Sequence, residues 1–393
     1  MKIKHNFTHT LYASYIGYIT QAVINNFTPL LFLTFQASYA LSLSKLTFLV
    51  TVNFLIQLAV DLLCAKFVDK IGYRPAIVAA HLFAAGGLAG LAVLPELFAD
   101  PYTGLLLAVG LYAMGGGLLE VLVSPIVEAC PTEKKSAAMS LLHSFYCWGH
   151  VFVVLASTLF FTTVGIQNWK TLALLWALIP LCNAFYFSRV PIARLHEEGE
   201  SMGIRQLFQT KLFWLLGVVM VCAGASELAM SQWVSAFAEA GLHVSKTAGD
   251  LAGPCMFAAL MGLTRVFYAK FSERIHLHAV LTASGGLCIV GYLLASLSPQ
   301  PLLSLVGCSL CGVAVGMMWP GTFSIASASC PRGGTAMFAL LALAGDLGCS
   351  LGPTTVGLVS GAAGGRLQSG LLAAIVFPAA LIVGIAALPT HKK

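Results

Sequence analysis

Charged side chains are scarce in this sequence. Asp, Glu, Lys and Arg make up only 9% of its 393 residues, whereas 58% of the residues are hydrophobic. A soluble domain has roughly 25% charged residues, because its surface must be solvated by water. So few charges cannot cover such a surface, and lipid is the alternative solvent. Since one span needs about 20 mainly apolar residues, the length accommodates about twelve spans and no sizeable soluble domain.

Other signatures are missing as well. The sequence has no G-x-x-x-x-G-K-[ST] phosphate loop, which argues against an ATP-driven pump. Its cysteines occur mostly singly in apolar runs, and the close pair Cys308 and Cys311 has no second pair or histidine at zinc spacing. We therefore expect no metal and no cofactor. The first apolar run continues to about Phe35 and contains Gln21, which is typical of a first span rather than a cleavable signal.

Twelve apolar segments follow one another, separated by short polar turns. We expect them at about 10–35, 45–68, 75–94, 103–129, 136–163, 169–188, 211–237, 246–270, 276–297, 301–328, 334–361 and 367–388. The longest polar stretch lies between the sixth and seventh segments. It predicts an N-terminal half, 1–188, a cytoplasmic linker, 189–210, and a C-terminal half, 211–393.

The basic residues indicate the orientation of the spans. With a cytoplasmic N-terminus, sixteen Lys and Arg lie in inside segments and four in outside loops, which leaves Arg265 within a span. Both termini are then cytoplasmic, as an even number of spans requires. The same rule accounts for the net charge of +6 without a nucleic-acid partner. We expect a monomeric, multi-pass protein of the cytoplasmic (inner) membrane.

An internal repeat relates the two halves at an offset of about 200 residues. The matching pairs include Ser44-Lys45 with Ser245-Lys246, Gly86-Gly87-Leu88 with Gly285-Gly286-Leu287, and Cys130-Pro131 with Cys330-Pro331. Their order and near-constant offset predict that each helix corresponds, in the same orientation, to the helix six positions later. The predicted fold class is thus an all-α membrane protein of two six-helix bundles related by a parallel pseudo-two-fold axis.

The loop after the second segment carries a motif. Residues 65–74 read Ala-Lys-Phe-Val-Asp-Lys-Ile-Gly-Tyr-Arg, in which Asp69, Lys70, Gly72 and Arg74 match the pattern G-x-x-x-D-[RK]-x-G-x-[RK] and Ala65 replaces its first glycine. With the two-half organisation, this motif resembles the major facilitator superfamily. The resemblance implies a transporter fold in which the loop acid, Asp69, pairs with the second half when the transporter faces outward.

Within that superfamily the chain is similar to the fucose permease-like sugar:proton symporters. The similarity lies in the Gly-Gly-Gly-Leu-Leu-Glu run at 115–120, in Ser124-Pro125, and in the Trp-Pro-Gly-Thr-Phe run at 319–323. It implies a proton-coupling role for Glu120. Three features depart from that group: Ser124 stands where Asn is frequent, the first helix lacks its Asp, and 143–146 reads His-Ser-Phe-Tyr.

Ionisable residues inside spans are expensive, at about 2.5–3.5 kcal/mol or more each, and thus indicate function. Glu120 and Glu227 lie near the middle of their segments, and Asp346 lies deep in the eleventh. A buried carboxyl group favours its neutral form, which suits a group that takes up and releases protons. We expect proton coupling at Glu120 first, with Glu227 and Asp346 as further candidates; a carboxyl that only hydrogen-bonds substrate or a neighbouring helix is the alternative.

A second set of residues is expected to gate the cytoplasmic side. Asp61 and Arg265 occupy equivalent positions of the repeat and carry opposite charges. They join Asp69, Lys70 and Arg74 of the loop motif as gating candidates. Asp346 is an alternative partner for Arg265, and the sequence leaves this pairing open.

Polar and aromatic side chains in the spans are candidates for substrate contacts. Asn53, Gln57 and Asp61 recur every four residues and share one helix face. Amides, acids and imidazoles can hydrogen-bond the hydroxyl groups of a sugar, and aromatic rings can pack against its C–H surface. The substrate candidates are Gln21, Asn25, Asn26, Asn53, Gln57, His143, Tyr146, Glu227, Gln232, Trp233 and Trp319.

The sequence as a whole predicts a secondary active transporter for a small polar solute, a sugar or sugar-like compound, coupled to protons or to sodium. An efflux transporter for amphipathic compounds is an alternative, because acids and aromatics in an apolar cavity also serve that task. An intramembrane transferase would need a clustered catalytic set near one membrane face, and no such cluster is visible. We therefore do not expect an enzyme.

Overall fold

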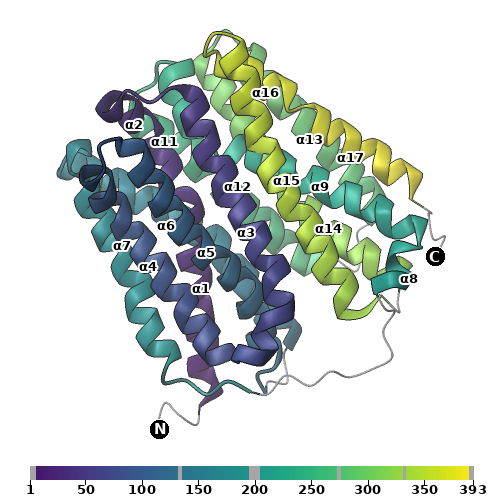
Figure 1. Cartoon of the computed structure of the whole chain (residues 1–393). Coiled ribbons are helices and arrows are strands. Elements are labelled where there is room, and N and C mark those ends of the chain that lie inside the picture. Colours follow the sequence, from purple (N-terminus) through teal and green to yellow (C-terminus); the bar gives the residue numbers. More distant parts are fainter. Residues whose placement is uncertain (1–5, 132–134, 194–203, 272–275, 331–332, 389–393) are drawn as a thin grey trace. The chain divides into compact units, whose positions relative to one another are not determined.

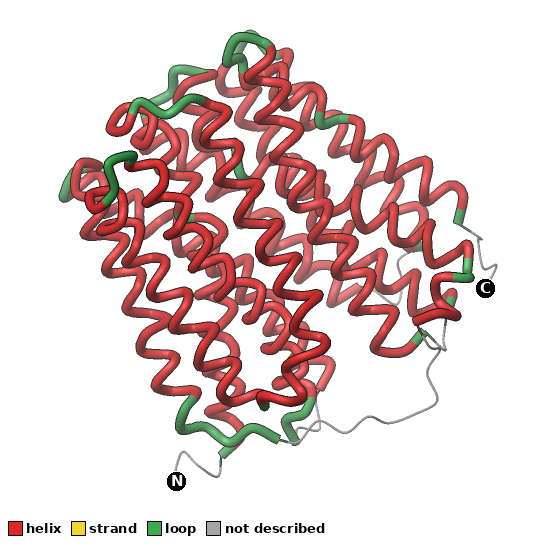
Figure 2. The backbone as a smooth tube through the Cα atoms, viewed as in Figure 1, coloured by secondary structure: helices red, strands yellow, loops and turns green. Residues whose placement is uncertain are grey.

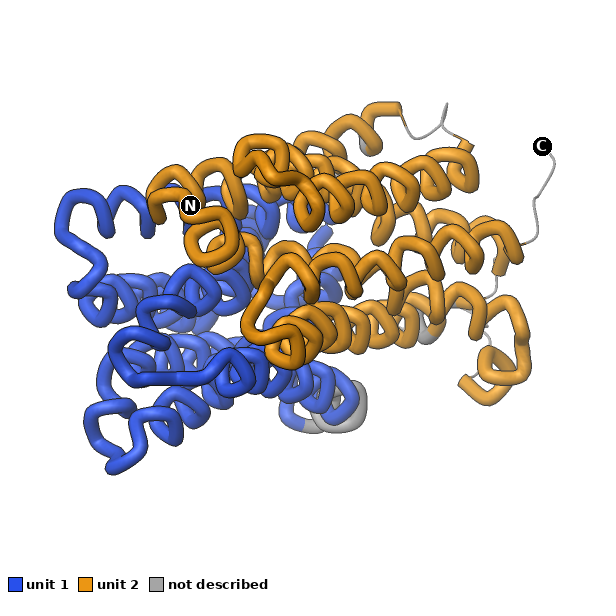
Figure 3. The backbone as a smooth tube through the Cα atoms, turned by 90° about the horizontal axis from the view of Figure 1, so that it is seen from above, with its two compact units in different colours: residues 1–197 blue, residues 198–393 orange. Residues whose placement is uncertain are grey.

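The computed structural model describes residues 6–131, 135–193, 204–271, 276–330 and 333–388. Within these ranges the chain is helical and contains no strand (Figures 1 and 2). It divides into two compact units, residues 1–197 and 198–393, which Figure 3 colours separately. Part of the predicted linker, residues 194–203, lies outside the described residues.

In its described residues, the first unit contains seven α-helices and two short 3₁₀ turns. They are α1 (Phe7–Asn26), η2 (Thr28–Leu31), α2 (Phe32–Tyr39), α3 (Leu43–Ile71), α4 (Tyr73–Leu97), α5 (Pro101–Glu128), α6 (Lys135–Thr163), η3 (Ile166–Asn168) and α7 (Trp169–Phe187). Local signals begin several of them: the Ser42 hydroxyl accepts from the N–H of Lys45 in α3, and Asp100 accepts from the N–H of Tyr102 in α5, directly before Pro101.

The second unit has more interruptions in its helices. Its elements are α8 (Ile204–Phe208), α9 (Lys211–Ser231), α10 (Val234–Ala236), η4 (Phe237–Gly241), α11 (Lys246–Asp250), η5 (Leu251–Cys255), α12 (Met256–Phe271), α13 (Leu277–Leu297), α14 (Pro301–Ser329), α15 (Gly334–Ala362), α16 (Leu367–Ala373) and α17 (Val376–Ala387). Here η4 and η5 are single π turns, which locally widen the helices that contain them.

The same helix pairing occurs in both units. In the first unit α4 packs against α5 and α7, α3 packs against α5, and α1 contacts α5, α6 and α7. In the second unit α13 packs against α14 and α17, α12 packs against α14, and α9 contacts α14, α15 and α17. Each of these six helices of the first unit thus has a counterpart with equivalent neighbours, as the internal repeat predicts.

Eleven helical segments in the described part of the chain are long and apolar enough to cross a membrane. The prediction of a multi-pass membrane protein is thereby confirmed. The expected first span, 10–35, corresponds to α1, η2 and α2, which are interrupted at Phe27 and are not among the eleven. A count of twelve spans and the cytoplasmic position of both termini remain predictions.

A buried polar contact joins three helices of the first unit. The side-chain amide of Asn183 in α7 lies 2.7 Å from Nε2 of His81 in α4 and donates to the carbonyl of Ala13 in α1 at 3.0 Å. His81 also contacts the carbonyl of Ile77 through Nδ1 at 2.7 Å, so its Nε2 accepts from Asn183. The side chains of His81 and Asn183 are buried. Both imidazole nitrogens and the amide nitrogen of Asn183 have partners, as an apolar surrounding requires, whereas Oδ1 of Asn183 has none among the described residues.

Candidate functional site

Five polar side chains meet inside the first unit, and we call them the amide cluster. Gln21 and Asn25 come from α1, Asn53 and Gln57 from α3, and Glu120 from α5. The four amides are buried and Glu120 is half-buried. Polar side chains from three different helices, α1, α3 and α5, therefore meet at one place in the first unit.

The hydrogen bonds of the amide cluster form a connected chain. Nε2 of Gln21 donates to Oε1 of Gln57 at 2.9 Å and to Oε2 of Glu120 at 3.3 Å. Nε2 of Gln57 donates to the side-chain oxygens of Asn25 and Asn53, both at 2.9 Å. Nδ2 of Asn53 also donates to Asn25 at 3.4 Å. The carboxyl group is thus linked to a set of groups that can each donate and accept.

The surroundings of this cluster are crowded on the side of α5. A Cβ atom at Gly116 would lie 3.1 Å from the side-chain oxygens of both Gln21 and Gln57. A larger residue there would displace the two amides, so glycine at 116 allows α5 to approach them. Oε1 of Gln21 is buried and has no hydrogen-bond partner among the described residues, and it can accept a hydrogen bond from a ligand.

Other predicted residues of the first unit lie apart from these hydrogen bonds. Asn26 donates to the carbonyl of Ala22 in its own helix at 2.9 Å, and Asp61 is buried one turn beyond Gln57 on α3. His143, on α6, is exposed and packs edge-on against the ring of Tyr18 at 5.5 Å. Tyr146 lies one turn further along α6 and is half-buried.

In the second unit, Glu227 and Arg265 form an ion pair. Nη2 of Arg265, on α12, donates to Oε2 of Glu227, on α9, at 3.3 Å, and their side chains are 19% and 9% exposed. Sequence reasoning left the partner of Arg265 open between Asp61 and Asp346, and did not consider Glu227. The charge of Glu227 is therefore compensated within its own unit.

The remaining predicted residues of the second unit differ in exposure. Gln232 and Trp233 follow α9, and Trp233 is fully buried with its indole N–H donating to the carbonyl of Pro353 at 2.9 Å. Trp319, on α14, is half-buried and lies directly against the backbone of Gly345 in α15. The next residue, Asp346, is buried. Of the two tryptophans, Trp319 alone retains surface that a ligand could contact.

The loop motif has a clear local structure. Gly72 separates α3 from α4 with φ = +91°, a backbone conformation that side chains with a Cβ rarely adopt. Nη1 of Arg74 donates to the carbonyls of Phe187 and Ser188 at 3.3 and 3.0 Å, at the end of α7. Arg74 therefore satisfies carbonyls that the helix itself leaves unpaired. The side chains of Asp69 and Lys70 lie outside the described residues.

The pattern of spans, motif and repeated pairing has a match among known families. The family model described as Major Facilitator Superfamily matches residues 14–353. The chain belongs to this superfamily. No curated protein sequence matches the chain.

Several solved transporters share the fold along nearly their whole length. The E. coli fucose:proton symporter FucP is 17% identical, with a TM-score of 0.66 and coverage of 97% of this chain and 98% of that one. The D-xylose–proton symporter is 14% identical, with a TM-score of 0.73 and coverage of 97% and 95%. A bacterial homologue of the human lysosomal transporter Spinster is 15% identical, with a TM-score of 0.75 and coverage of 96% and 97%. The predicted fold is confirmed.

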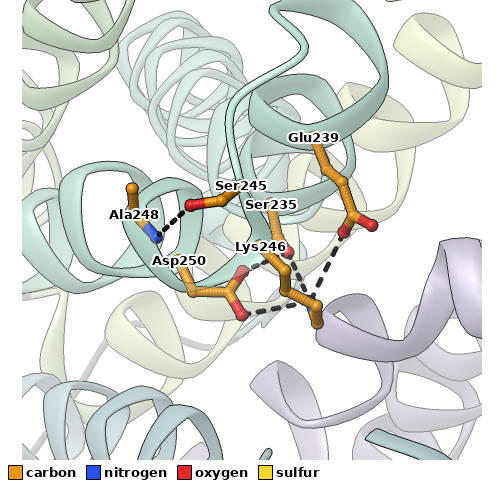
Figure 4. Close-up of polar contacts among 6 residues, drawn as sticks. All are labelled: Ser235, Glu239, Ser245, Lys246, Ala248 and Asp250. Carbon is orange, nitrogen blue, oxygen red and sulfur yellow. Dashed lines mark hydrogen bonds and ion pairs between the residues drawn. The ribbon is translucent and has the colours of Figure 1, made fainter. Parts of the chain in front are cut away.

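A charged cluster in the second unit was missed by sequence reasoning. Asp250 is almost fully buried, accepts from the Ser235 hydroxyl at 2.6 Å and pairs with Lys246 at 3.0 Å (Figure 4). Lys246 also faces Glu239 at 3.8 Å. The Lys–Asp spacing of four residues could have indicated the pair, since such residues are neighbours on a helix. The cluster joins α10, η4 and α11 and thereby stiffens the hairpin between α9 and α12.

Proposed function

We propose that this protein is a secondary active transporter that moves a small polar solute, a sugar or sugar-like compound, by alternating access with proton coupling. It would act as a monomer in the cytoplasmic membrane, with α1, η2 and α2 as the first of twelve spans. Its halves would be residues 1–188 and 211–393, joined by the cytoplasmic linker 189–210. Membership of the superfamily supports transport, and the symporters for fucose and D-xylose among the structures with this fold make sugars the first substrates to test.

The amide cluster is the observation that carries the proposal. Four carboxamides and one carboxyl group are costly inside a membrane protein unless they serve a purpose. Together they offer donors and acceptors at hydrogen-bonding distance, and Oε1 of Gln21 can accept a further bond. A sugar hydroxyl both donates and accepts, so it can replace an internal hydrogen bond of the cluster without leaving a group unpaired.

Glu120 is our first candidate for the proton site. Its hydrogen bond to Gln21 links the charge state of the carboxyl group directly to the amides that would contact the solute. An ionised carboxylate accepts the bond from Nε2 of Gln21, whereas a protonated carboxyl can instead donate to an amide oxygen. Glu227 ranks lower because Arg265 compensates its charge, and Asp346 remains the third candidate.

Transport in proteoliposomes tests this proposal. A thermal-shift screen with fucose, D-xylose, nucleosides, amino acids and organic ions, with and without sodium and at two pH values, first identifies a solute. We then expect Glu120→Gln to keep exchange of that solute between the two sides of the membrane and to lose accumulation driven by a proton gradient. The matched control is Glu96→Gln, which changes an exposed carboxyl group paired with Lys170.

Two outcomes would contradict the proposal in different ways. Undiminished proton-driven accumulation by the Glu120→Gln variant would remove Glu120 from the coupling mechanism. A screen in which amphipathic organic ions, and no sugar, stabilise the protein would contradict the sugar substrate and leave transport itself in place.

A further inference from the structure

A cavity of about 540 Å³ lies in the second unit where three chain connections meet. Its wall is formed by Ala240 and Gly241 at the end of η4 and His243 after it, by Ser296 and Leu297 at the end of α13, and by residues 364–369 and Leu372, which run from the connection after α15 into α16. These connections lie at the end of the unit opposite the C-terminal end of α17. The volume is in the usual range of ligand-binding sites, about 300–1,000 Å³.

The ionisable side chains that line this cavity are both basic. Arg366 and His243 line it, and no Asp or Glu is among the lining residues. Nε of Arg366 donates to the carbonyl of Ala363 at 3.3 Å, which holds the guanidinium in place. Within the described ranges its two terminal nitrogens form no hydrogen bond or ion pair. The nearby Glu239 does not line the cavity; it faces Lys246 at 3.8 Å, as Figure 4 shows, and shares that lysine with Asp250.

A buried hydroxyl group gives a second, independent indication of a ligand. Ser296 is 9% exposed, and its Oγ has no hydrogen-bond partner among the residues that the structure describes. Buried polar groups in native proteins are almost always paired, so an unpaired one on a cavity wall indicates a missing partner. Across the same cavity, Nε2 of Gln368 donates to the carbonyl of Gly241 at 2.9 Å and thereby holds two of the three connections together.

We propose that this cavity binds a phosphate-bearing molecule. The guanidinium of Arg366 presents two parallel N–H groups that match the oxygens of a phosphate. The imidazole of His243 and the Ser296 hydroxyl add donors around the same space. The absence of any lining carboxylate disfavours a cation. The cavity lies at the ends of candidate membrane-spanning helices, where lipid phosphates are expected, so both a lipid headgroup and a free organic phosphate can supply this chemistry.

Ligand titration of the full chain, purified in a phosphate-free detergent and stripped of lipid, tests the site. The probes are sn-glycerol 3-phosphate and a short-chain phosphatidylglycerol, with glycerol as the phosphate-free match, and the readout is the shift in melting temperature. We expect one of the phosphate probes to bind the unchanged protein and to raise its melting temperature. Glycerol should not bind. Arg366→Gln should weaken binding roughly tenfold, because it removes a charge-assisted pair.

Two further variants keep the test decisive. Arg205→Gln changes an arginine of α8 that does not line the cavity. This variant should bind the phosphate probe with the affinity of the unchanged protein. His243→Asn removes the second basic group and introduces a residue that tolerates the positive φ of 55° at this position. It should also weaken binding of the phosphate probe, and it provides the test if Arg366→Gln does not fold. Binding of neither phosphate probe, or equal affinity in the unchanged protein and the cavity variants, would overturn the proposal. The probe that binds identifies the source of the phosphate.

Discussion

Arg265 and Glu227 provide the most direct test of the interactions in the second unit. Replacing Arg265 with Met keeps a long side chain beside Met261 but removes the guanidinium that lies 3.3 Å from the carboxyl group of Glu227. The side chain of Glu227 is only 9% exposed, so water cannot replace the lost partner. The variant must therefore bury an uncompensated carboxylate or protonate it.

The size of the effect follows from the burial of the pair. Removal of one partner from a buried ion pair costs about 3–5 kcal/mol, because the other charge is left unpaired. The lower end, about 3 kcal/mol, applies here because the side chain of Arg265 keeps 19% exposure to solvent. For a unit of this size that corresponds to a fall in melting temperature of about 6–12 °C. The loss should be smaller at pH 5 than at pH 8, because a protonated carboxyl group needs no partner charge.

A double-mutant cycle in detergent measures the coupling between the two residues. The cycle compares the unchanged protein with Arg265→Met, Glu227→Gln and the double variant, and thermal unfolding gives each stability. We expect the double variant to lose less than the sum of the two single variants by about 1–3 kcal/mol, since each single variant strands the other charge. Strictly additive losses, or a melting temperature of Arg265→Met equal to that of the unchanged protein, would refute the ion pair.

Two packing predictions accompany this one. Gly116→Val should displace the amides beside it, lower stability by about 1–3 kcal/mol through overpacking and abolish the thermal shift given by the solute. The control is Gly86→Val, where no heavy atom lies within 4 Å of the new Cβ. An equal effect of both substitutions would contradict the crowding at Gly116. Asn183→Leu leaves the buried Nε2 of His81 without a donor and should lower the free energy of unfolding by about 1–3 kcal/mol. The control is Asn168→Leu, which removes an exposed hydrogen bond and should lower stability little. Similar losses of stability in both variants would argue against the buried contact.

Hydropathy alone determined the class of protein and most helix positions. The segments expected at 45–68 and 75–94 correspond to α3, Leu43–Ile71, and α4, Tyr73–Leu97. This is possible because the backbone groups of a membrane-spanning helix must be paired within that helix, so each span can be predicted from its own stretch of sequence. Interruptions inside spans were not predicted. The first run breaks around Phe27, and η5 widens the helix that contains Pro254.

Spacing along the sequence also identified much of the amide cluster, but not its connections. The four-residue period placed Asn53 and Gln57 on one face of α3, because positions on a single helix follow from its geometry. It could not say that Gln21 donates to both Gln57 and Glu120. Which face of α1 meets α3 and α5 depends on how side chains of all three helices interlock, and no single helix contains that information.

The same limit applies to the charged residues of the second unit. Sequence reasoning recognised Arg265 and Glu227 as costly inside a span, since the depth of an ionisable residue in an apolar segment can be read from the sequence. Their pairing depends on the rotation of α9 and α12 about their own axes, which packing within the unit decides. The sequence by itself thus determined that this is a multi-pass membrane protein with mid-span acids. Only the tertiary structure decided which acid has a cation beside it and which is joined to amides.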